Sequence, residues 1–547
     1  MDETLNAAPR SSARWAARLG ITGLYVALTA VMTWPQLPRL ATHTAEDPDV
    51  FFNLWRLRWI HRALTTAPDR LFDGNLFYPE PGVLAMSDAL LLQGVLALPL
   101  FLAGLPPVLV HNLLLLGAIV ASGAGMFVFA RHVSGSRTAA ILAGIVFAFA
   151  PYRFEHYMHM ELQWAVWIPW TFWALQRTFE TGTLRFGVLT GIFIALQMLS
   201  AIYYGIFLGM FVAVIGCVQL LRVPRTRFVS TLRSLAAGAA IAAAVSAAYS
   251  IPYQSVAPRV GTRFVHEVTM FSAQPADYLA ATPSNLLYGG REGKQERRLF
   301  PGFLPLLLAL FGALALRRSV AMVSYLVGLA LAFELSLGMH GLLYPVLYEH
   351  VSALRGLRAP ARASIFGLAF LGVLAAAGCT ALGRRLRPAA RGAAAVSLSA
   401  LVLLEYWVAP LHLMRVDNTA PPLYAWLARQ PRGVVAEFPM ALHPGVSDYE
   451  SRYAYMSTFH WMPLLNGYSG YRPPSYLRRL KQLTAFPDDV SLEQLRADGV
   501  RYLIIHSGGY EPEERRRIVE RLIADYGLAY LGDWNDGWGD GVVFALR

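Results

Sequence analysis

The chain has 547 residues, of which 55% are hydrophobic and only 15% charged, and it carries a formal net charge of +12. Soluble globular proteins contain about 25% charged residues, so this composition excludes an ordinary soluble protein and indicates a multi-pass membrane protein. The positive charge does not indicate a nucleic-acid partner, because the arginines recur at the ends of apolar runs, which is a topology signal.

Apolar segments of membrane length recur from the N-terminus to about residue 410. The first follows Arg10, Arg14 and Arg18 and has no small-residue cleavage site, so we expect an uncleaved first helix with a cytoplasmic N-terminus. The segments predicted to cross the membrane are 19–39, 108–130, 138–151, 164–176, 186–204, 206–221, 234–251, 303–316, 319–337, 365–382 and 393–410, eleven in all.

One further apolar run, Ala89–Ala103, is ambiguous because it is short and contains Gln93 and Pro99. If it does not cross, the later basic clusters all lie on the cytoplasmic side, as the positive-inside rule requires. We therefore predict an interfacial or re-entrant helix here, with the C-terminus outside the cytoplasm. The arginines that decide this are Arg131, Arg137, Arg177, Arg185, Arg222, Arg225, Arg227, Arg233, Arg317, Arg318, Arg384, Arg385, Arg387 and Arg391.

Two long parts of the chain then lie on the outer face. The first outer loop is predicted over 41–107, and the region 411–547 is predicted to form a small extracytoplasmic α/β domain after a membrane domain at 1–410. Apolar runs in that region indicate strands, and periodic patterns indicate helices. The strands are expected at 433–438, 500–506 and 541–546, and the helices at 475–483, 491–497 and 511–526.

Two acids, Asp47 and Asp49, follow the first crossing segment. The stretch 49–65 has helical spacing and mixes aromatic with basic residues, so we expect it to lie along the membrane surface. Asp49 and Asn53 then share a helix face. Partly desolvated by lipid and Trp55, Asp49 would have a raised pKa and serve as a general base. The alternative, favoured by position alone, is that these acids cap the helix.

The second outer loop contains His156 and His159, three residues apart, so that one helical face presents both with Glu161 nearby. Imidazole and carboxylate both bind divalent metals, which makes a metal site possible. Contact with a substrate is favoured over a metal, with Arg153 as a phosphate ligand. An interfacial turn, with histidine and tyrosine among lipid headgroups, is an equal alternative.

A cluster of arginines, Arg355, Arg358 and Arg362, lies outside the membrane and so runs against the positive-inside bias. Capture of a lipid-linked phosphate explains it, because guanidinium forms bidentate bonds to phosphate oxygens. Binding of anionic lipid headgroups is the alternative.

The loop 466–474 is rich in glycine and tyrosine, a composition that suits carbohydrate because tyrosine rings stack on sugar faces. An ordinary cluster of turn residues would have the same composition. This motif alone therefore gives only a weak indication of carbohydrate binding.

These features together resemble the GT-C glycosyltransferases, and more closely a large bacterial family of glycosyltransferase-like membrane proteins. The matching stretches are Asp47–Trp55, Leu71–Pro79, Pro151–Arg153 with His156 and His159, and Tyr203–Gly205. They span most of the membrane part, and the likeness is weaker over 411–547. The resemblance implies transfer of a sugar from a polyprenyl-phosphate donor to a glycan, lipid or protein acceptor, at the outer face of the bacterial cytoplasmic membrane.

The resemblance also implies residue roles. The acid of the first loop is the catalytic base in GT-C enzymes, which points first to Asp49 and second to Asp47. We expect a direct, inverting displacement in which Arg153, Arg358 or Arg362 stabilises the departing phosphate. The second outer loop lacks the paired acids of metal-dependent oligosaccharyltransferases, so a divalent metal remains only a possibility. The residues expected to contact substrate are Asn53, Trp55, His156, His159, Glu161, Tyr203 and Tyr204.

Two other functions use the same features. A transporter or flippase of lipid-linked sugars would need the outer arginines and a lipid groove, although the sequence has no inverted repeat of the kind common in transporters. A scaffold that binds envelope partners through its outer domain would not need the outer acids at all.

Overall fold

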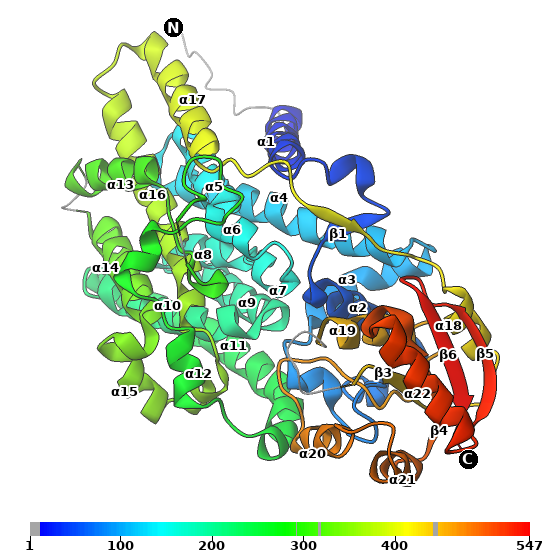
Figure 1. Cartoon of the computed structure of the whole chain (residues 1–547). Helices are drawn as coiled ribbons and strands as arrows, with labels where there is room; N and C mark the ends of the chain where they lie inside the picture. The colour runs from blue at the N-terminus through cyan, green and yellow to red at the C-terminus, as the bar shows by residue number, and fades with distance from the viewer. Residues whose placement is uncertain (1–10, 292, 316–318, 441–446, 547) are drawn as a thin grey trace, which may run out of the picture.

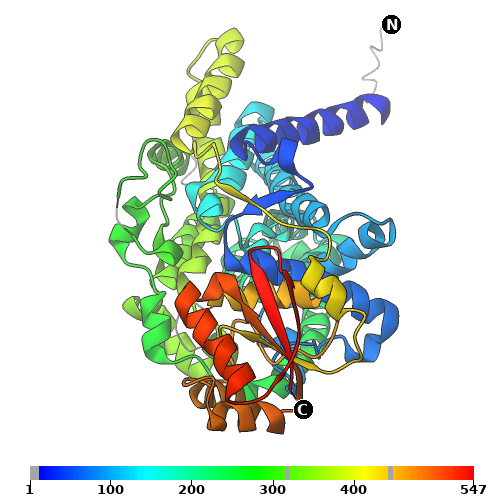
Figure 2. The same ribbon diagram turned by 45° about the vertical axis from the view of Figure 1, so that its right-hand side comes forward.

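The computed structural model describes residues 11–291, 293–315, 319–440 and 447–546. Arg10, Arg317 and Arg318, which entered the topology argument, lie outside these residues, as does the last position of the predicted segment 303–316. A large helical body holds most of the chain, and a smaller domain with a β-sheet lies at one end of it (Figures 1 and 2).

A helix occupies each of the eleven segments predicted to cross the membrane, which confirms the helical part of the fold prediction. They are α1 (Ser11–Met32), α4 (Pro107–Ser134), α5 (Arg137–Phe149), α8 (Trp167–Thr181), α9 (Leu184–Ser200), α10 (Ile202–Leu220), α11 (Arg225–Val260), α13 (Phe303–Ala315), α14 (Val320–Ser336), α16 (Ser364–Gly383) and α17 (Pro388–Glu405). Within the described residues, six helices are long and apolar enough to cross a membrane, and five further apolar helices are shorter.

The ambiguous run forms α3 (Leu91–Leu102), which has 12 residues. At 1.5 Å per residue it is about 18 Å long, well short of the roughly 30 Å hydrocarbon core. Its Gln93 donates to the carbonyl of Ser200 at the end of α9, at 2.8 Å. The placement of this helix as interfacial or re-entrant stays a prediction.

Short helices in the loops that are predicted to lie on the outer face stand between the long ones and carry most of the polar residues discussed below. They are α6 (Pro151–Glu155), α7 (Met160–Gln163), α12 (Val265–Met270), α15 (Leu343–His350) and the 3-10 turns η5 (Gln295–Arg297) and η8 (Pro360–Ala363).

The first outer loop forms β1 (His43–Ala45) and α2 (Pro48–Thr66). Asp47 caps α2: its backbone is extended and its side chain accepts from the N–H of Asp49, while Pro48 fills the first helical position. The expectation that this helix lies along the membrane surface does not hold for its first half, which is buried in protein. Its residues from Val50 to Leu57 are buried, and α19 (Ser447–Ser457) of the C-terminal region packs against it.

The C-terminal region forms a four-stranded sheet in the order β3 (Val434–Phe438), β4 (Val500–His506), β6 (Asp540–Ala545) and β5 (Ala529–Asn535). The first pair is parallel and the other two are antiparallel. The three predicted strands are present, as β3, β4 and β6. The helices around the sheet, besides α19, are α18 (Pro422–Leu427), α20 (Pro474–Gln482), α21 (Asp489–Ala497) and α22 (Pro512–Ala524).

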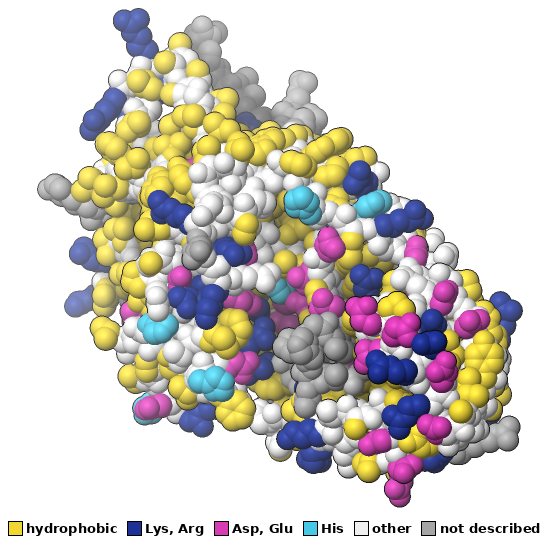
Figure 3. All heavy atoms as spheres, in the orientation of Figure 1, with side chains coloured by type: hydrophobic (Ala, Val, Ile, Leu, Met, Phe, Trp, Pro, Cys, Tyr) yellow, Lys and Arg dark blue, Asp and Glu magenta, His cyan; other side chains and the backbone are white. Residues whose placement is uncertain are grey.

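The C-terminal domain is joined to the first outer loop by backbone pairing. The strand β2 (Leu413–Arg415), at its entrance, pairs antiparallel with β1. Deeper in the contact, Phe77 donates its N–H to the carbonyl of Asn466 at 2.9 Å. Figure 3 shows hydrophobic side chains gathered over α13, α17 and their neighbours, and charged ones over the C-terminal domain.

Candidate active site

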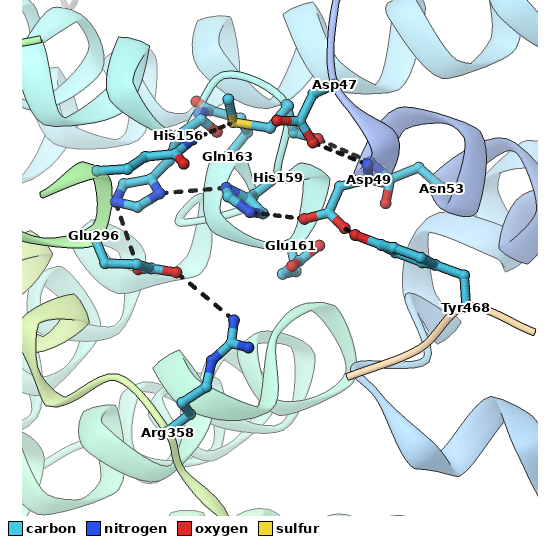
Figure 4. A network of polar contacts seen from close by, with 12 residues as sticks. Asp47, Asp49, Asn53, His156, His159, Glu161, Gln163, Glu296, Arg358 and Tyr468 are labelled. Atoms are coloured by element: carbon cyan, nitrogen blue, oxygen red, sulfur yellow. Dashed lines mark hydrogen bonds and ion pairs between the residues drawn. The ribbon is translucent and has the colours of Figure 1, made fainter. Parts of the chain in front are cut away.

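Asp49, in the first turn of α2, lies where three separate parts of the chain meet (Figure 4). Its Oδ2 is 2.8 Å from Nε2 of His159 in the second outer loop. Its Oδ1 accepts the hydroxyl of Tyr468, from the C-terminal domain, at 2.6 Å. The capping alternative therefore holds for Asp47, whose Oδ1 accepts the N–H of Asp49 at 2.9 Å, while the side chain of Asp49 faces other groups.

The two acids have pKa values pushed apart by their surroundings. Burial opposes ionisation of Asp49, but the hydrogen bonds from His159 and Tyr468 outweigh it and hold its pKa below the usual range. The expected raised pKa of Asp49 is therefore wrong. Burial and the neighbouring charge of Asp49 instead raise the pKa of Asp47 to about 6. Asp49 is thus ionised at neutral pH, whereas Asp47 takes up a proton near pH 6.

Asparagine in place of Asp47 is expected to flatten the pH dependence of stability. Between pH 3.8 and about 6 the folded state binds the proton of Asp47 more tightly than the unfolded chain, so the free energy of unfolding falls as pH rises through this window. Asparagine caps a helix as well as aspartate but does not ionise. The thermal midpoint of D47N relative to wild type should therefore increase from pH 4 to above pH 6.

The exposed Asp69 of the same loop supplies the matched control, D69N, whose midpoint should follow wild type across this range. A D47N protein whose midpoint falls as steeply as that of wild type would contradict the assignment of this titration to Asp47.

His156 and His159 touch through their Nδ1 atoms, 3.3 Å apart. Burial lowers the pKa of His156 to about 3, so this ring is neutral. Burial also disfavours charge on His159, but the hydrogen bond to Asp49 prevails and raises its pKa. We therefore assign the Nε2–H of His159 as the donor to Asp49. Of the two facing Nδ1 atoms of His156 and His159, one donates to the other.

The Nε2 atom of His156 lies 3.9 Å from Oε2 of Glu296, in η5. Arg362, in η8, holds the Glu296 carboxylate through two bonds, of 2.5 Å from Nη2 and 3.1 Å from Nε. Both partners are buried, with 5% and 8% of their surface exposed. Arg358 reaches the same carboxylate at 4.0 Å. A polar chain of Asp49, His159, His156, Glu296 and Arg362 thus joins the acid to the arginines.

Other predicted substrate residues border this polar chain. The hydroxyl of Tyr203 accepts the backbone N–H of Arg358 at 2.6 Å, and the guanidinium of Arg362 lies over its ring at 4.7 Å. Asn53 donates to the carbonyl of Met158 at 2.9 Å. The remaining two pair with neighbours: Glu161 lies 3.3 Å from Arg56, and the Tyr204 hydroxyl lies 3.5 Å from that of Tyr152.

Two predicted residues are not brought to the polar chain. Trp55 is fully buried, stacks on Trp59, and donates its indole N–H to Asn75 at 2.9 Å, so it packs the first loop. Arg153 is 1% exposed, and its guanidinium donates to the carbonyl of Gln163 at 3.0 Å. Both side chains are therefore packed inside the protein.

Sequence reasoning missed two residues of this site. Glu296 lies in a long outer loop with no motif around it, apart from the adjacent Arg297 and Arg298. Tyr468 belongs to the glycine- and tyrosine-rich loop, but 419 positions separate it from Asp49 and nothing in the sequence links them.

Among the described residues, no group of three or more histidine, cysteine, aspartate or glutamate side chains is arranged to hold a metal ion. The two histidines of the second outer loop are instead engaged with each other and with Asp49.

No protein-family model matches the sequence, and no curated protein matches it. Solved structures do match. The arabinofuranosyltransferase AftD from Mycobacteria superposes on 97% of this chain with a TM-score of 0.64 and 16% identity, and this chain spans only 40% of its length. ArnT from Cupriavidus metallidurans, bound to undecaprenyl phosphate, has a TM-score of 0.50 and 13% identity over 96% of this chain and 98% of ArnT.

A third neighbour is the oligosaccharyltransferase of Archaeoglobus fulgidus, with a TM-score of 0.52 and 12% identity over 89% of this chain and 69% of that one. All three have the GT-C architecture. The predicted GT-C fold, with membrane helices and a small C-terminal sheet domain, is thereby confirmed.

Proposed function

We propose that this multi-pass membrane protein of GT-C fold is a glycosyltransferase. It moves a sugar from a polyprenyl-phosphate-linked donor to an acceptor hydroxyl at the outer face of the cytoplasmic membrane, with its N-terminus inside. The observation that carries the proposal is the polar chain, which sets an ionised carboxylate, Asp49, at one end and buried arginine at the other. ArnT bound to undecaprenyl phosphate and the arabinofuranosyltransferase AftD support a lipid-linked donor.

The reaction is a single displacement. Asp49 removes the proton from the acceptor O–H, and that oxygen attacks the anomeric carbon of the sugar. The bond between this carbon and the phosphate oxygen breaks, and the polyprenyl phosphate leaves with the electron pair. Inversion follows because the attacking and leaving oxygens lie on opposite sides of the carbon. Guanidinium groups stabilise the charge that gathers on the phosphate.

The two arginines have different roles in this proposal. The guanidinium of Arg362 is committed to Glu296 and buried, so it fixes the polar chain. The side chain of Arg358 is 34% exposed and stands 4.0 Å from the same carboxylate, so that, within the described part of the chain, it has donors free to reach a phosphate. Tyr203 holds the backbone of Arg358 in place. We assign no substrate contact to Arg153, which is buried against Gln163.

Glutamine in place of Arg358 is expected to weaken binding of undecaprenyl phosphate by about tenfold or more. A hydrogen bond to a charged group contributes about 1.5–3 kcal/mol to binding. Because the Arg358 side chain is partly exposed, we expect its contribution at the lower end of this range. The dissociation constant of the full-length protein in nanodiscs, titrated with undecaprenyl phosphate, measures the effect.

Arg355 provides the matched control, because it lies in the same outer loop but donates to carbonyls of its own segment, those of Tyr348 and Glu349. R355Q should bind as wild type does. Equal weakening in R355Q and R358Q would show a general effect of outer charge and remove Arg358 from the phosphate site.

The activity itself is tested with labelled polyprenyl-phosphate arabinose, mannose, glucose and galactose, supplied with envelope extract as acceptor. A transferase moves labelled sugar from at least one donor to the acceptor in a reaction that needs Asp49. A lipid carrier moves the donor across vesicle membranes without releasing sugar, and a scaffold does neither. Either of these last two results would refute the proposed function.

A further inference from the structure

The hydroxyl of Tyr468 donates a hydrogen bond to one of the two carboxylate oxygens of Asp49, the proposed base. The bond from this hydroxyl to Oδ1 of Asp49 is 2.6 Å long, in the range of O–H donors bound to an ionised carboxylate. The other oxygen, Oδ2, is 2.8 Å from Nε2 of His159. An acceptor hydroxyl that is to lose its proton to Asp49 must make the same kind of O–H···O bond, and Oδ1 is the oxygen that His159 leaves to a hydroxyl donor.

The loop that carries Tyr468 is fixed on both sides of this residue. Two backbone positions before it and two after it are tied down, so the main chain has little freedom to lift away from α2. The contacts are the carbonyl of Asn466 with the N–H of Phe77 at 2.9 Å, the N–H of Gly467 with Glu450 at 3.2 Å, the carbonyl of Gly470 with Arg263 at 2.7 Å and the N–H of Tyr471 with the carbonyl of Met86 at 3.0 Å.

The Tyr468 side chain itself is held less firmly. Its ring meets the ring of Phe52 edge to face, at 5.5 Å between centroids, and the side chain is only partly buried. Rotation about its side-chain bonds would therefore open Oδ1 of Asp49 without moving the loop. Figure 4 shows the tyrosine reaching the acid from the side opposite to His159.

We infer that the Tyr468 hydroxyl holds the place of the acceptor hydroxyl on Asp49, so that the acceptor enters between α2 and the loop 466–474 and displaces this side chain. This inference rests on the proposed function and adds the acceptor side to it. The reacting group of the acceptor is a hydroxyl, and the C-terminal domain forms the wall against which it binds. The donor phosphate lies on the other side of Asp49, toward Arg358.

The same contact protects a bound donor from water. A water molecule at Oδ1 of Asp49 would lose a proton to the carboxylate and attack the anomeric carbon. The carbon–phosphate-oxygen bond would break, the lipid phosphate would leave with the electron pair, and free sugar would be released. Tyr468 does not itself attack, because burial and the charge of Asp49 raise the pKa of its hydroxyl and keep it protonated.

The test is release of free sugar in the absence of any acceptor. Y468F keeps the ring on Phe52 and removes only the O–H group. Full-length wild type and Y468F are incubated with the four labelled donors named above, and free label is measured. We expect several-fold faster release from Y468F. The double variant Y468F/D49N should return to background, which shows that the released sugar comes from attack through Asp49.

The control is Y502F, which removes another buried hydroxyl of the same domain, one that donates to the carbonyl of Pro431 at 2.8 Å. It should hydrolyse donor at the wild-type rate. Release that depends on Asp49 but is unchanged or slower in Y468F overturns the inference and leaves the proposed function intact. No Asp49-dependent release or transfer from any donor overturns the proposed function, and the inference with it.

Discussion

Asparagine in place of Asp49 is expected to lower sugar transfer by roughly 10²–10⁴-fold, the usual contribution of a positioned general base. The amide cannot take a proton from the acceptor, but its oxygen can still accept a hydrogen bond from Tyr468 or His159. The fold should therefore survive the change, since the helix cap belongs to Asp47. Initial rates with the labelled donors, together with the thermal midpoint, measure both effects.

Asp47 is the rival for the same role, and the two variants decide between them. Its pKa of about 6 is closer to that of an effective base at neutral pH than the depressed pKa of Asp49. However, one of its oxygens caps α2. If D47N loses transfer and D49N retains it, the base is Asp47. Wild-type rates in both variants would leave the reaction without an acid from this loop.

Methionine in place of Arg362 is expected to destabilise the protein by about 3–5 kcal/mol, the usual cost of removing one partner of a buried ion pair. The carboxylate of Glu296 would remain buried without its cation. The double variant R362M/E296M removes both charges and should recover most of that loss. Denaturant unfolding of the detergent-solubilised protein measures the difference. A stable single variant would show that Glu296 finds another cation, for which the guanidinium of Arg358 lies 4.0 Å away.

The double variant R362M/E296M also tests whether Arg362 contributes only to the stability of the protein or also to phosphate binding. If Arg362 only fixes the polar chain, R362M/E296M should bind undecaprenyl phosphate within a few-fold of wild type. A loss of tenfold or more in this stable protein would place the Arg362 guanidinium on the phosphate, beside that of Arg358.

The membrane helices could be predicted from sequence because lipid imposes a simple rule: each crossing segment must be apolar and must satisfy its backbone internally. The strands β3, β4 and β6 could also be predicted from the sequence, because each carries a continuous apolar run. The strand β5 could not be predicted, because its residues are only partly buried or exposed and form no apolar run. Asp49 could be singled out because Asn53 and Trp55 follow it at helical spacing and because the resemblance to GT-C enzymes points to an acid of the first loop, whereas position alone favours a helix cap.

The partners of Asp49 could not be predicted, because tertiary folding alone brings them together. Tyr468 lies 419 positions away, and Glu296 and Arg362 are 66 positions apart, with no pattern that ties them. The predicted rise in the pKa of Asp49 is wrong for the same reason. The sequence indicates that Asp49 is partly desolvated, but it does not indicate the hydrogen bond from His159 that lowers the pKa. The aromatic residues of α2 indicate a lipid-facing surface, whereas the C-terminal region packs on them: Phe51 meets Tyr455, Phe52 meets Tyr468 and Trp59 meets Trp461.

The pairing of β1 with β2 bears on how such a protein can be altered or can diverge. A C-terminal region taken from a distant relative would place a β2 of different sequence against β1 and an α19 of different sequence against α2. Chimeras that exchange 411–547 alone should therefore misassemble, while those that exchange 41–107 with it should fold. Because Asp49 lies in one of these segments and Tyr468 in the other, acceptor preference and the proton-accepting group would be inherited as one unit.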